Sequence, residues 1–394
     1  MNLLFIQGGS RWKLDELGNV YTDSNFNEFI WERYRYYCDK LTVILRREEK
    51  IYSSDEAKRR FNVFDVNKSN YVALPDLYQP VTNVLSFNIR KKIKSVIEEE
   101  VKKADKIIIR SLGNIYTNTA LKCARKYHKS YMVEVTGFAW ESMWYHSLRG
   151  KIVALPKELQ YRALMKDVPY AVYVTEEALQ KRYPCTGKSL GCSDVELPTL
   201  DENILKSRLK KINEEKSKIV IGTAAFLDVG WKGQEYVIRA LAELKKYGND
   251  QFEYQLIGGG TGRHLMDVAK NLGVENQIII IGLLPHDKVF EWLDSIDVYV
   301  QPSFMEGLCR SLVEAMSRAC PIVCTDVGGN YELASQDNLF KKADYRHLAD
   351  ILKTFTNKEK MEKEAKRCFE KAKEYDKKVL DERRDVFYKE IMGV

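Results

Sequence analysis

Two glutamates in the second half of the chain have the spacing and the surroundings of a ligand-binding pair. They lie in the segment PSFMEGLCRSLVEAM, which runs from Pro302 to Met316. Glu306 falls in a loop after a short apolar strand pattern, and Glu314 falls in a helical pattern among apolar neighbours. A carboxylate in such surroundings is costly unless it has a partner. At about 1.5 Å per helical residue, the carboxylates are on the order of 10 Å apart, which suits two contacts on one long ligand.

The start of the predicted helix, between the two glutamates, favours a diphosphate. The first backbone N–H groups of a helix have no partner within it and carry a partial positive charge. Here these groups belong to Leu308, Cys309 and Arg310. With a diphosphate at this point, Glu314 would accept hydrogen bonds from a ribose and Glu306 from a sugar. The alternative is that Glu314 is a buried structural acid.

Further loops in this half also follow apolar strand patterns. They are VGWKGQ at Val229–Gln234, IGGGTGRHL at Ile257–Leu265, GLLPH at Gly282–His286 and DVGGNYEL at Asp326–Leu333. Lys232 in the first would meet a phosphate, and the glycines of the second would let a ligand approach the backbone. That glycine run has Arg263 in place of the third glycine of a dinucleotide fingerprint, which argues against a nicotinamide enzyme. Because the carboxyl ends of parallel strands meet at one edge of a sheet, the loops are expected to form one site.

The elements that position these loops alternate between short apolar runs and helical patterns, which is typical of parallel sheets in α/β domains. Strands are expected in the first half at Leu3–Gln7, Leu41–Leu45, Phe61–Val66, Lys106–Arg110, Tyr131–Val135 and Tyr170–Thr175, and one helix at Asn25–Cys38. In the second half strands are expected at Ile219–Ala224, Phe252–Gly258, Gln277–Gly282, Val298–Gln301 and Pro321–Thr325.

The 394 residues are enough for two Rossmann-like parallel-sheet domains that face a cleft. We expect an acceptor-binding domain at residues 1–197, a nucleotide-binding domain at 198–375 and a helical tail at 376–394. From Lys358 onward the dense Lys and Glu favour a solvated capping helix, with packing against the first domain as the alternative.

Composition excludes several classes of protein. Lys plus Arg (63) exceeds Asp plus Glu (56) by 7, which is too small a surplus for nucleic-acid binding but fits an anionic ligand or an anionic membrane surface. Eight cysteines without a C-x-x-C pair indicate reduced thiols. Without a signal peptide or an apolar run of roughly 18 residues, the chain is expected in the cytoplasm, at most peripheral at the inner membrane face. It has no D-x-D or H-E-x-x-H motif, so no metal is expected.

As a set, the motifs of the second half resemble the retaining glycosyltransferases of the GT-B fold, in particular group 4. The E-x7-E pair, the Lys232–Gly233 pair, the glycine run and the Gly328–Gly329 pair follow the order of that family, over roughly Ile219 to Leu333. The resemblance implies that Lys232 meets the diphosphate and that the loop at Leu283 and Leu284 receives the base. The implied donor site comprises Gly222, Thr223, Lys232, Gly258, Gly259, Arg263, Leu283, Leu284, Glu306, Gly307, Leu308, Cys309 and Glu314.

The resemblance also implies the reaction. A hexosyl group would pass from a nucleotide-diphosphate sugar, with UDP favoured, to an acceptor hydroxyl with retention at the anomeric carbon. Glu306, Lys232 and Arg310 would carry the catalysis, mostly by stabilising the departing diphosphate. The acceptor would be a saccharide or a lipid-linked saccharide in surface polysaccharide or glycolipid assembly.

The first half resembles the family in its architecture alone. Its glycine loop, Gly8 and Gly9, would follow the first strand and face the acceptor, together with Glu134 and Gly137. Many family members have a histidine near that second point, whereas this chain reads Glu134-Val135-Thr136-Gly137. Many also carry an arginine shortly before the lysine of the donor site, where this chain has Gly222 and Thr223, so that Arg310 or Arg263 would supply the charge.

Two other functions remain open on sequence grounds. One is a nucleotide-sugar epimerase of similar fold, and the other is a non-catalytic partner that binds nucleotide-sugars. Peripheral contact with an anionic membrane would use the basic helical segment Arg90–Lys103, and the aromatic group Phe138, Trp140, Trp144 and Tyr145 would contact the acceptor. The alternatives for these two segments are a solvated helix face and core packing.

Overall fold

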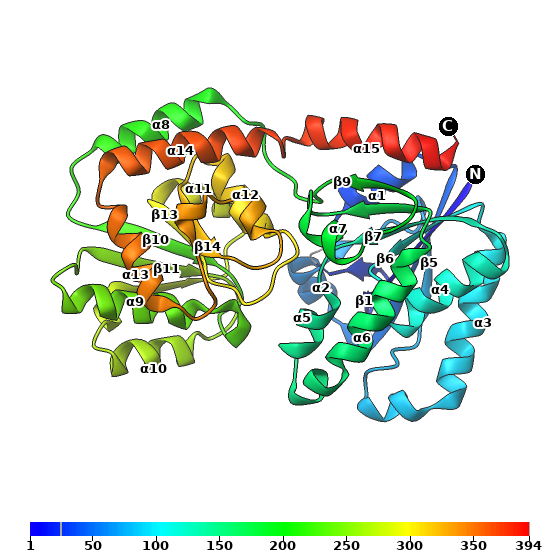
Figure 1. The fold of residues 1–394 in the computed structure, drawn as a ribbon. Helices are drawn as coiled ribbons and strands as arrows, with labels where there is room; N and C mark the ends of the chain where they lie inside the picture. Colours follow the sequence, from blue (N-terminus) through cyan, green and yellow to red (C-terminus); the bar gives the residue numbers. More distant parts are fainter. Residues whose placement is uncertain (24–25, 394) are drawn as a thin grey trace.

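The computed structural model of the chain describes residues 1–23 and 26–393, which form two α/β domains side by side (Figure 1). Asn25, where the first helix was expected to begin, lies outside the described residues, as does Val394 at the end of the expected tail. Within the described part no helix combines the length and the apolar composition needed to cross a membrane.

The first domain is built on a sheet of nine strands among the described residues. They are β1 (Asn2–Asp15), β2 (Val20–Thr22), β3 (Lys40–Tyr52), β4 (Asn62–Val63), β5 (Asn70–Leu74), β6 (Lys106–Arg110), β7 (Ser130–Val135), β8 (Tyr170–Tyr173) and β9 (Lys188–Gly191). Seven strands run parallel in the order β5-β3-β1-β6-β7-β8-β9, and β2 and β4 join the second half of β1 as an antiparallel edge. The loops after β1 and β6 therefore flank the point where the strand order reverses, which is where such sheets bind ligands.

The helices of the first domain alternate with its strands, and the longer ones bury apolar residues. They are α1 (Glu28–Arg35), α2 (Ser54–Arg60), η1 (Val81–Leu85), α3 (Phe87–Lys103), α4 (Ile115–Lys126), α5 (Ala139–Trp144), α6 (Leu148–Lys166) and α7 (Ala178–Arg182). In α3 the Ser86 side chain accepts a hydrogen bond from the backbone N–H of Ile89 at the start of the helix. The buried residues Ile93, Ile97 and Val101 recur every four positions, so α3 rests on the sheet by a single stripe.

The second domain has six parallel strands among the described residues, in the order β12-β11-β10-β13-β14-β15. Its elements are α8 (Glu202–Asn213), β10 (Ile219–Ala224), η2 (Gly230–Lys232), α9 (Gln234–Lys246), β11 (Phe252–Ile257), α10 (Arg263–Asn271), η3 (Glu275–Gln277), β12 (Ile278–Gly282), α11 (His286–Ser295), β13 (Val298–Gln301), α12 (Arg310–Ser317), β14 (Ile322–Thr325), η4 (Asn330–Glu332), η5 (Gln336–Asn338), β15 (Leu339–Phe340) and α13 (Tyr345–Thr354). This is the dinucleotide-fold strand order, and its reversal lies between β10 and β13.

The structure corrects one strand that was expected in the first domain. The expected strand at Phe61–Val66 is wrong except for Asn62–Val63, which forms the short antiparallel β4. The parallel edge strand is instead β5, which pairs with β3 in the register Thr42 to Asn70. Apolar periodicity cannot tell these two segments apart, because pairing with a distant strand decides which one joins the sheet.

The end of the chain is not a solvated tail. Helix α14 (Lys358–Lys373) buries Met361, Ala365, Cys368 and Phe369 on the second domain, so the expectation of a solvated helix is wrong. Helix α15 (Lys377–Met392) then returns to the first domain, across which it lies in Figure 1. There Lys106 donates a hydrogen bond to the backbone carbonyl of Ile391 at 2.8 Å.

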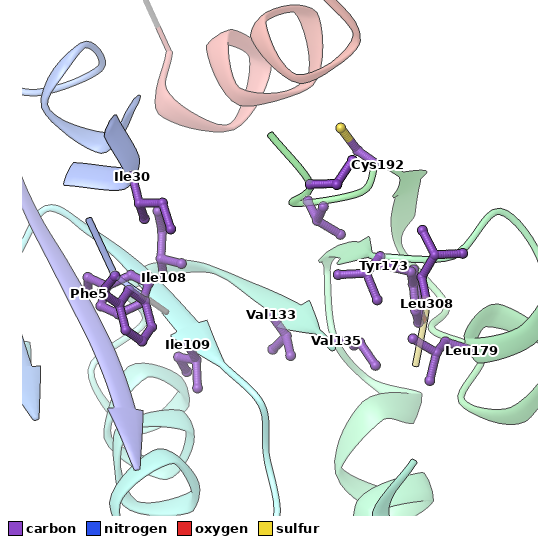
Figure 2. Close-up of a cluster of buried hydrophobic side chains, with 14 of the residues drawn as sticks. Phe5, Ile30, Ile108, Ile109, Val133, Val135, Tyr173, Leu179, Cys192 and Leu308 are labelled. Carbon is purple, nitrogen blue, oxygen red and sulfur yellow. The ribbon is translucent and has the colours of Figure 1, made fainter. Parts of the chain in front are cut away.

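The two domains share buried surface at the edge where their strands end. Figure 2 shows part of the core around the first sheet, with Leu308 of the second domain beside Leu179 of the first. Glu332, in η4, accepts hydrogen bonds from the backbone N–H groups of Glu176, Glu177 and Ala178 at 2.7–3.1 Å. These contacts hold the two domains together across the cleft.

Candidate donor site

Lys232 and Glu306 meet at the point where the strand order of the second sheet reverses. Lys232 follows β10, and Glu306 follows β13, which pairs with β10. Lys232 Nζ donates a hydrogen bond to Glu306 Oε1 at 2.8 Å, and the two side chains are 19% and 13% exposed. The sequence placed each residue in a separate strand-end loop, and the fold makes them an ion pair.

The backbone around this pair explains the Lys-Gly motif. Gly233 adopts φ +76°, and a Cβ at that position would lie 2.1 Å from the carbonyl oxygen of Pro302. A glycine is therefore required for the β10 loop to lie directly against the β13 loop. Phe304 donates its backbone N–H to Trp231 O at 2.8 Å, which fixes the two loops together.

Just before α12, Leu308 and Cys309 offer a ligand their backbone and not their side chains. The helix begins at Arg310, and among the described residues no side chain caps it. Leu308 and Cys309 are buried, and burial raises the pKa of the Cys309 thiol to about 12. The thiol is thus neutral and turned into the core, so these two residues can contact a ligand through their N–H groups alone.

Glu314 lies on α12, where it meets a histidine that sequence reasoning missed. His286 Nε2, at the first residue of α11, is 3.8 Å from Glu314 Oε1. The hydrogen bond to Glu314 raises the pKa of His286, while burial and the charge of Arg310 oppose the rise. The GLLPH motif contained this histidine, but its meeting with Glu314 depends on the packing of α11 beside α12.

Arg310, the first residue of α12, acts electrostatically on groups of both domains. Burial acts to raise the pKa of Asp194, but the charges of Arg110 and Arg310 lower it to about 2. The Arg310 charge therefore acts on His286 in α11 and on Asp194, which precedes α8. Its expected role at the diphosphate stays a prediction.

The backbone of the glycine run after β11 packs directly against the loop after β10. Gly258 has φ +141°, and a Cβ there would lie 2.0 Å from Ala225 O, so the loops after β10 and β11 are in close contact. Asp228, which the sequence did not single out, accepts hydrogen bonds from the backbone N–H groups of Thr261 and Gly262 at 2.7 and 2.9 Å. Gly259 packs near the Phe226 ring, and Arg263 begins α10 with an exposed side chain.

The loop that is expected to bind the base is exposed to solvent at Leu283. Leu283 is 81% exposed, and Leu284 is half-buried against the core. The loop follows β12, at the same sheet edge as the loops after β10 and β11. It can therefore receive a flat ring at one end of the site, whereas Lys232 and Glu306 lie at the point of strand reversal.

Two expected donor contacts are wrong. The Thr223 side chain is fully buried, donates to Val300 O at 2.6 Å and accepts from the Tyr254 hydroxyl at 2.8 Å. Gly222 makes room for the ring of Trp292, since a Cβ there would lie 2.5 Å from that ring. Both residues lie inside β10, where their neighbours are core side chains, so the strand end that reaches the cleft lies beyond them.

The first-domain glycines do not form a loop after the first strand. Strand β1 continues to Asp15, and Gly8 and Gly9 lie in an irregular stretch where its register with β3 shifts between Ile6 and Arg11. A Cβ on Gly8 would lie 2.2 Å from Asn114 Oδ1, so the Asn114 side chain covers this glycine. The expected loop at these glycines is therefore corrected to a bulged strand, and their position facing the acceptor stays a prediction.

Glu134 is also corrected, because it is buried and fully partnered. It accepts hydrogen bonds from the hydroxyl groups of Tyr34 and Tyr388 and from Arg110, at 2.7–3.0 Å. Tyr388 comes from α15, so Glu134 ties the end of the chain to the first sheet. Gly137, in contrast, does lie at the cleft: a Cβ on Gly307 would be 3.5 Å from Gly137 Cα and 2.3 Å from Thr136 O.

A cavity of about 410 Å³ lies between the domains, with Glu306 in its wall. The second domain contributes Phe304 and Asp326, and the first contributes Phe138 and Arg182. Among the described residues there is no group of three or more His, Cys, Asp or Glu side chains arranged to hold a metal ion.

Comparison with known proteins agrees with this architecture. The family model for glycosyl transferases group 1 matches residues 205–375. Protein CapJ of Staphylococcus aureus is 30% identical over 359 residues, which are 89% of this chain and 85% of that protein. The N-acetylgalactosamine-N,N'-diacetylbacillosaminyl-diphospho-undecaprenol 4-alpha-N-acetylgalactosaminyltransferase of Campylobacter jejuni is 27% identical over 45% of this chain and 47% of its own length.

The fold has a match over the whole chain. The crystal structure of HepE from Anabaena in complex with UDP-glucose superposes with a TM-score of 0.64 at 15% identity, and the match covers 100% of both chains. Together with the extended similarity to CapJ, this establishes the two parallel-sheet domains as a GT-B fold. The chain therefore belongs to the glycosyl transferases group 1 family and is a nucleotide-sugar glycosyltransferase.

Proposed function

We propose that the protein transfers a hexosyl group from a UDP-sugar to a hydroxyl of a lipid-linked saccharide, with retention at the anomeric carbon, in surface polysaccharide or glycolipid assembly. The observation that carries the proposal is the Lys232–Glu306 pair at the strand reversal, beside the open start of α12. The UDP-glucose in the HepE structure supports the donor class. The name of the Campylobacter jejuni relative, with its diphospho-undecaprenol acceptor, supports the acceptor class.

The donor would lie across the start of α12. Its ribose hydroxyls would donate to Glu314, its diphosphate would meet Lys232 and the N–H groups of Leu308 and Cys309, and its sugar would reach Glu306. Glu306 would then exchange its bond with Lys232 for a bond with a sugar hydroxyl. The Lys232 cation is thereby released to the diphosphate at the moment the donor binds.

The reaction breaks the bond between the anomeric carbon and the diphosphate oxygen and forms one between that carbon and the acceptor oxygen. The acceptor hydroxyl would attack from the face that the diphosphate leaves, and its proton would pass to the departing diphosphate. Lys232 and the helix start, with Arg310 as the further cation, would stabilise the growing negative charge. The reaction so written needs no first-domain carboxylate, which agrees with the burial of Glu134.

The acceptor would enter through the cavity between the domains, where Glu306 and Phe304 face Phe138 and Arg182. Closure of the domains, held by Glu332, would keep water from the donor. A lipid-linked acceptor also implies where the protein works, which is in the cytoplasm and in peripheral contact with the inner membrane face.

A thermal-shift panel tests the donor class directly. UDP, GDP, ADP and their sugars are compared without added metal, and we expect UDP and UDP-sugars to raise the melting temperature most, because a ligand that binds the folded state stabilises it. A larger rise with GDP or ADP compounds would contradict the UDP assignment. Binding without any transfer or hydrolysis of the sugar would favour the non-catalytic alternative.

A further inference from the structure

Two segments of the first domain expose large apolar side chains that the fold does not use. In η1 and the first turn of α3, Leu85 is 91% exposed and Phe87 is 76% exposed. In the first turns of α6, Leu148 is 80% exposed and Ile152 is 79% exposed. Val81 is also exposed, and these five side chains together are here called the apolar tip.

Helix α6 has two apolar faces, one packed on the core and one exposed. Its buried residues Gly150, Ala154, Tyr161 and Met165 pack inward. Leu148, Ile152, Leu155 and Leu159, four, three and four positions apart, form a second apolar stripe, and all four are exposed. A helix in a folded domain needs one such stripe, so the second indicates a partner.

Topology brings both segments to one place. The chain enters η1 and α3 after β5 and enters α5 and α6 after β7, and these strands belong to the same parallel set. Their carboxyl ends therefore point to the edge that carries the cleft. Arg90 of α3 and Lys157 of α6 line one cavity of about 600 Å³, so the two helices lie close together. Figure 1 shows the starts of α3 and α6 at the lower end of the first domain.

The charges beside the apolar tip have one sign. Residues 81–94 contain Arg90, Lys91, Lys92 and Lys94 without an acid, and residues 148–157 contain Arg149, Lys151 and Lys157 without an acid. The acids of α3 come later, at Glu98, Glu99 and Glu100. Only the first half of the predicted segment Arg90–Lys103 is thus basic. Apolar side chains flanked by basic ones fit an anionic bilayer, and the same charges repel a second copy of this surface.

We infer that the apolar tip inserts into an anionic lipid bilayer and that the surrounding lysines and arginines contact its headgroups. This inference rests on the proposed function. The membrane contact would hold the edge of the first domain that carries the cleft at the bilayer, where a lipid-linked acceptor lies. The contact surface is a specific part of the first domain, formed by η1, the start of α3 and the start of α6.

Vesicle flotation tests the inference. The full chain is mixed with vesicles of phosphatidylcholine alone or of phosphatidylcholine and phosphatidylglycerol in equal parts, and we expect binding to the second kind. The variant that combines Leu85→Ser, Leu148→Ser and Ile152→Ser should have an affinity for these vesicles lower by about tenfold or more. The reason is that it lacks three apolar side chains whose transfer from water into the bilayer favours binding. The matched control is Leu17→Ser, Tyr247→Ser and Val386→Ser, three side chains that are 74–75% exposed outside the tip.

A charge variant separates the two parts of the surface. Lys91→Glu with Lys94→Glu should abolish the preference for anionic vesicles, whereas Lys378→Glu on α15 should leave it unchanged. Wild-type protein that ignores both kinds of vesicle, or a control that loses as much binding as the tip variant, would overturn the inference. So would a wild-type dimer that the tip variant converts to a monomer, since that result assigns the tip to a second copy.

A thermal-shift measurement on the same proteins distinguishes failure of this inference from failure of the proposed function. The UDP-sugar thermal shift of each tip variant should equal that of the wild type, because the tip lies outside the donor site. Loss of vesicle binding with an intact thermal shift concerns the bilayer contact alone, and a missing thermal shift in the wild type concerns the donor assignment alone.

Discussion

Lys232 Nζ and Glu306 Oε1 are 2.8 Å apart, and this contact joins the loops that follow the two strands flanking the reversal of the second sheet. The pair keeps a cation and a carboxylate at the cleft in a partly buried setting, where each neutralises the other. A donor with an anionic diphosphate and a hydroxyl-rich sugar can replace both halves of this bond. The contact therefore connects the resting site to the proposed reaction.

Replacing Glu306 by Gln should lower sugar transfer by about a hundredfold or more, because a charged contact made to the reacting sugar is lost. The affinity for UDP, which lacks the sugar, should change little. Steady-state transfer and calorimetric UDP binding measure the two effects. Equal losses in both measurements would contradict the assignment of Glu306 to the sugar.

Replacing Lys232 by Ala should weaken UDP-glucose binding by about 10-fold to 100-fold, as expected for a lost hydrogen bond to a charged group. Transfer should fall further, since the same cation stabilises the departing diphosphate. Lys246→Ala, on the exposed face of α9, is the matched control and should leave both unchanged. Unaltered binding in Lys232→Ala would place the diphosphate elsewhere.

Binding of UDP-glucose should strengthen as pH rises through the pKa of His286. Glu314 raises that pKa above its ordinary value of 6.5, so the protonated ring holds Glu314 at lower pH and competes with the ribose. The stabilisation that this pair adds to the fold changes in the opposite direction: it is present below the unfolded pKa and is lost as pH rises through the folded one. Calorimetry at pH values around the His286 pKa should show an affinity for UDP-glucose that rises with pH in the wild type. In His286→Ala the affinity should depend less on pH. A profile that is identical in both proteins would remove His286 from the site.

Replacing Glu134 by Ala should destabilise the protein by about 3–5 kcal/mol, because the buried Arg110 and two tyrosine hydroxyls lose their common partner. Thermal or denaturant unfolding measures this effect. Transfer per folded molecule should stay near that of the wild type, since Glu134 is enclosed by Tyr34, Arg110 and Tyr388. A stable variant without activity would return Glu134 to the acceptor site.

Much of the second domain could be predicted from the sequence alone. The strands at Ile219–Ala224 and Val298–Gln301 agree with β10 and β13 residue for residue. The sequence also predicts that Lys232 and Glu306 each follow a strand and that Glu314 lies in a helix, which agrees with β10, β13 and α12. These assignments depend on short apolar runs and on the polar, glycine-containing segments between them, which are local properties of the chain.

Tertiary structure alone decided which of these residues meet. Tyr34, Arg110, Glu134 and Tyr388 are spread over most of the chain, and only the return of α15 to the first sheet encloses Glu134. Likewise the burial of Thr223, the bulged strand at Gly8 and the pairing of His286 with Glu314 depend on neighbours that no sequence window contains. The physical reason is that periodicity records which residues are apolar in a row, whereas burial and ion pairing depend on the elements that pack against that row.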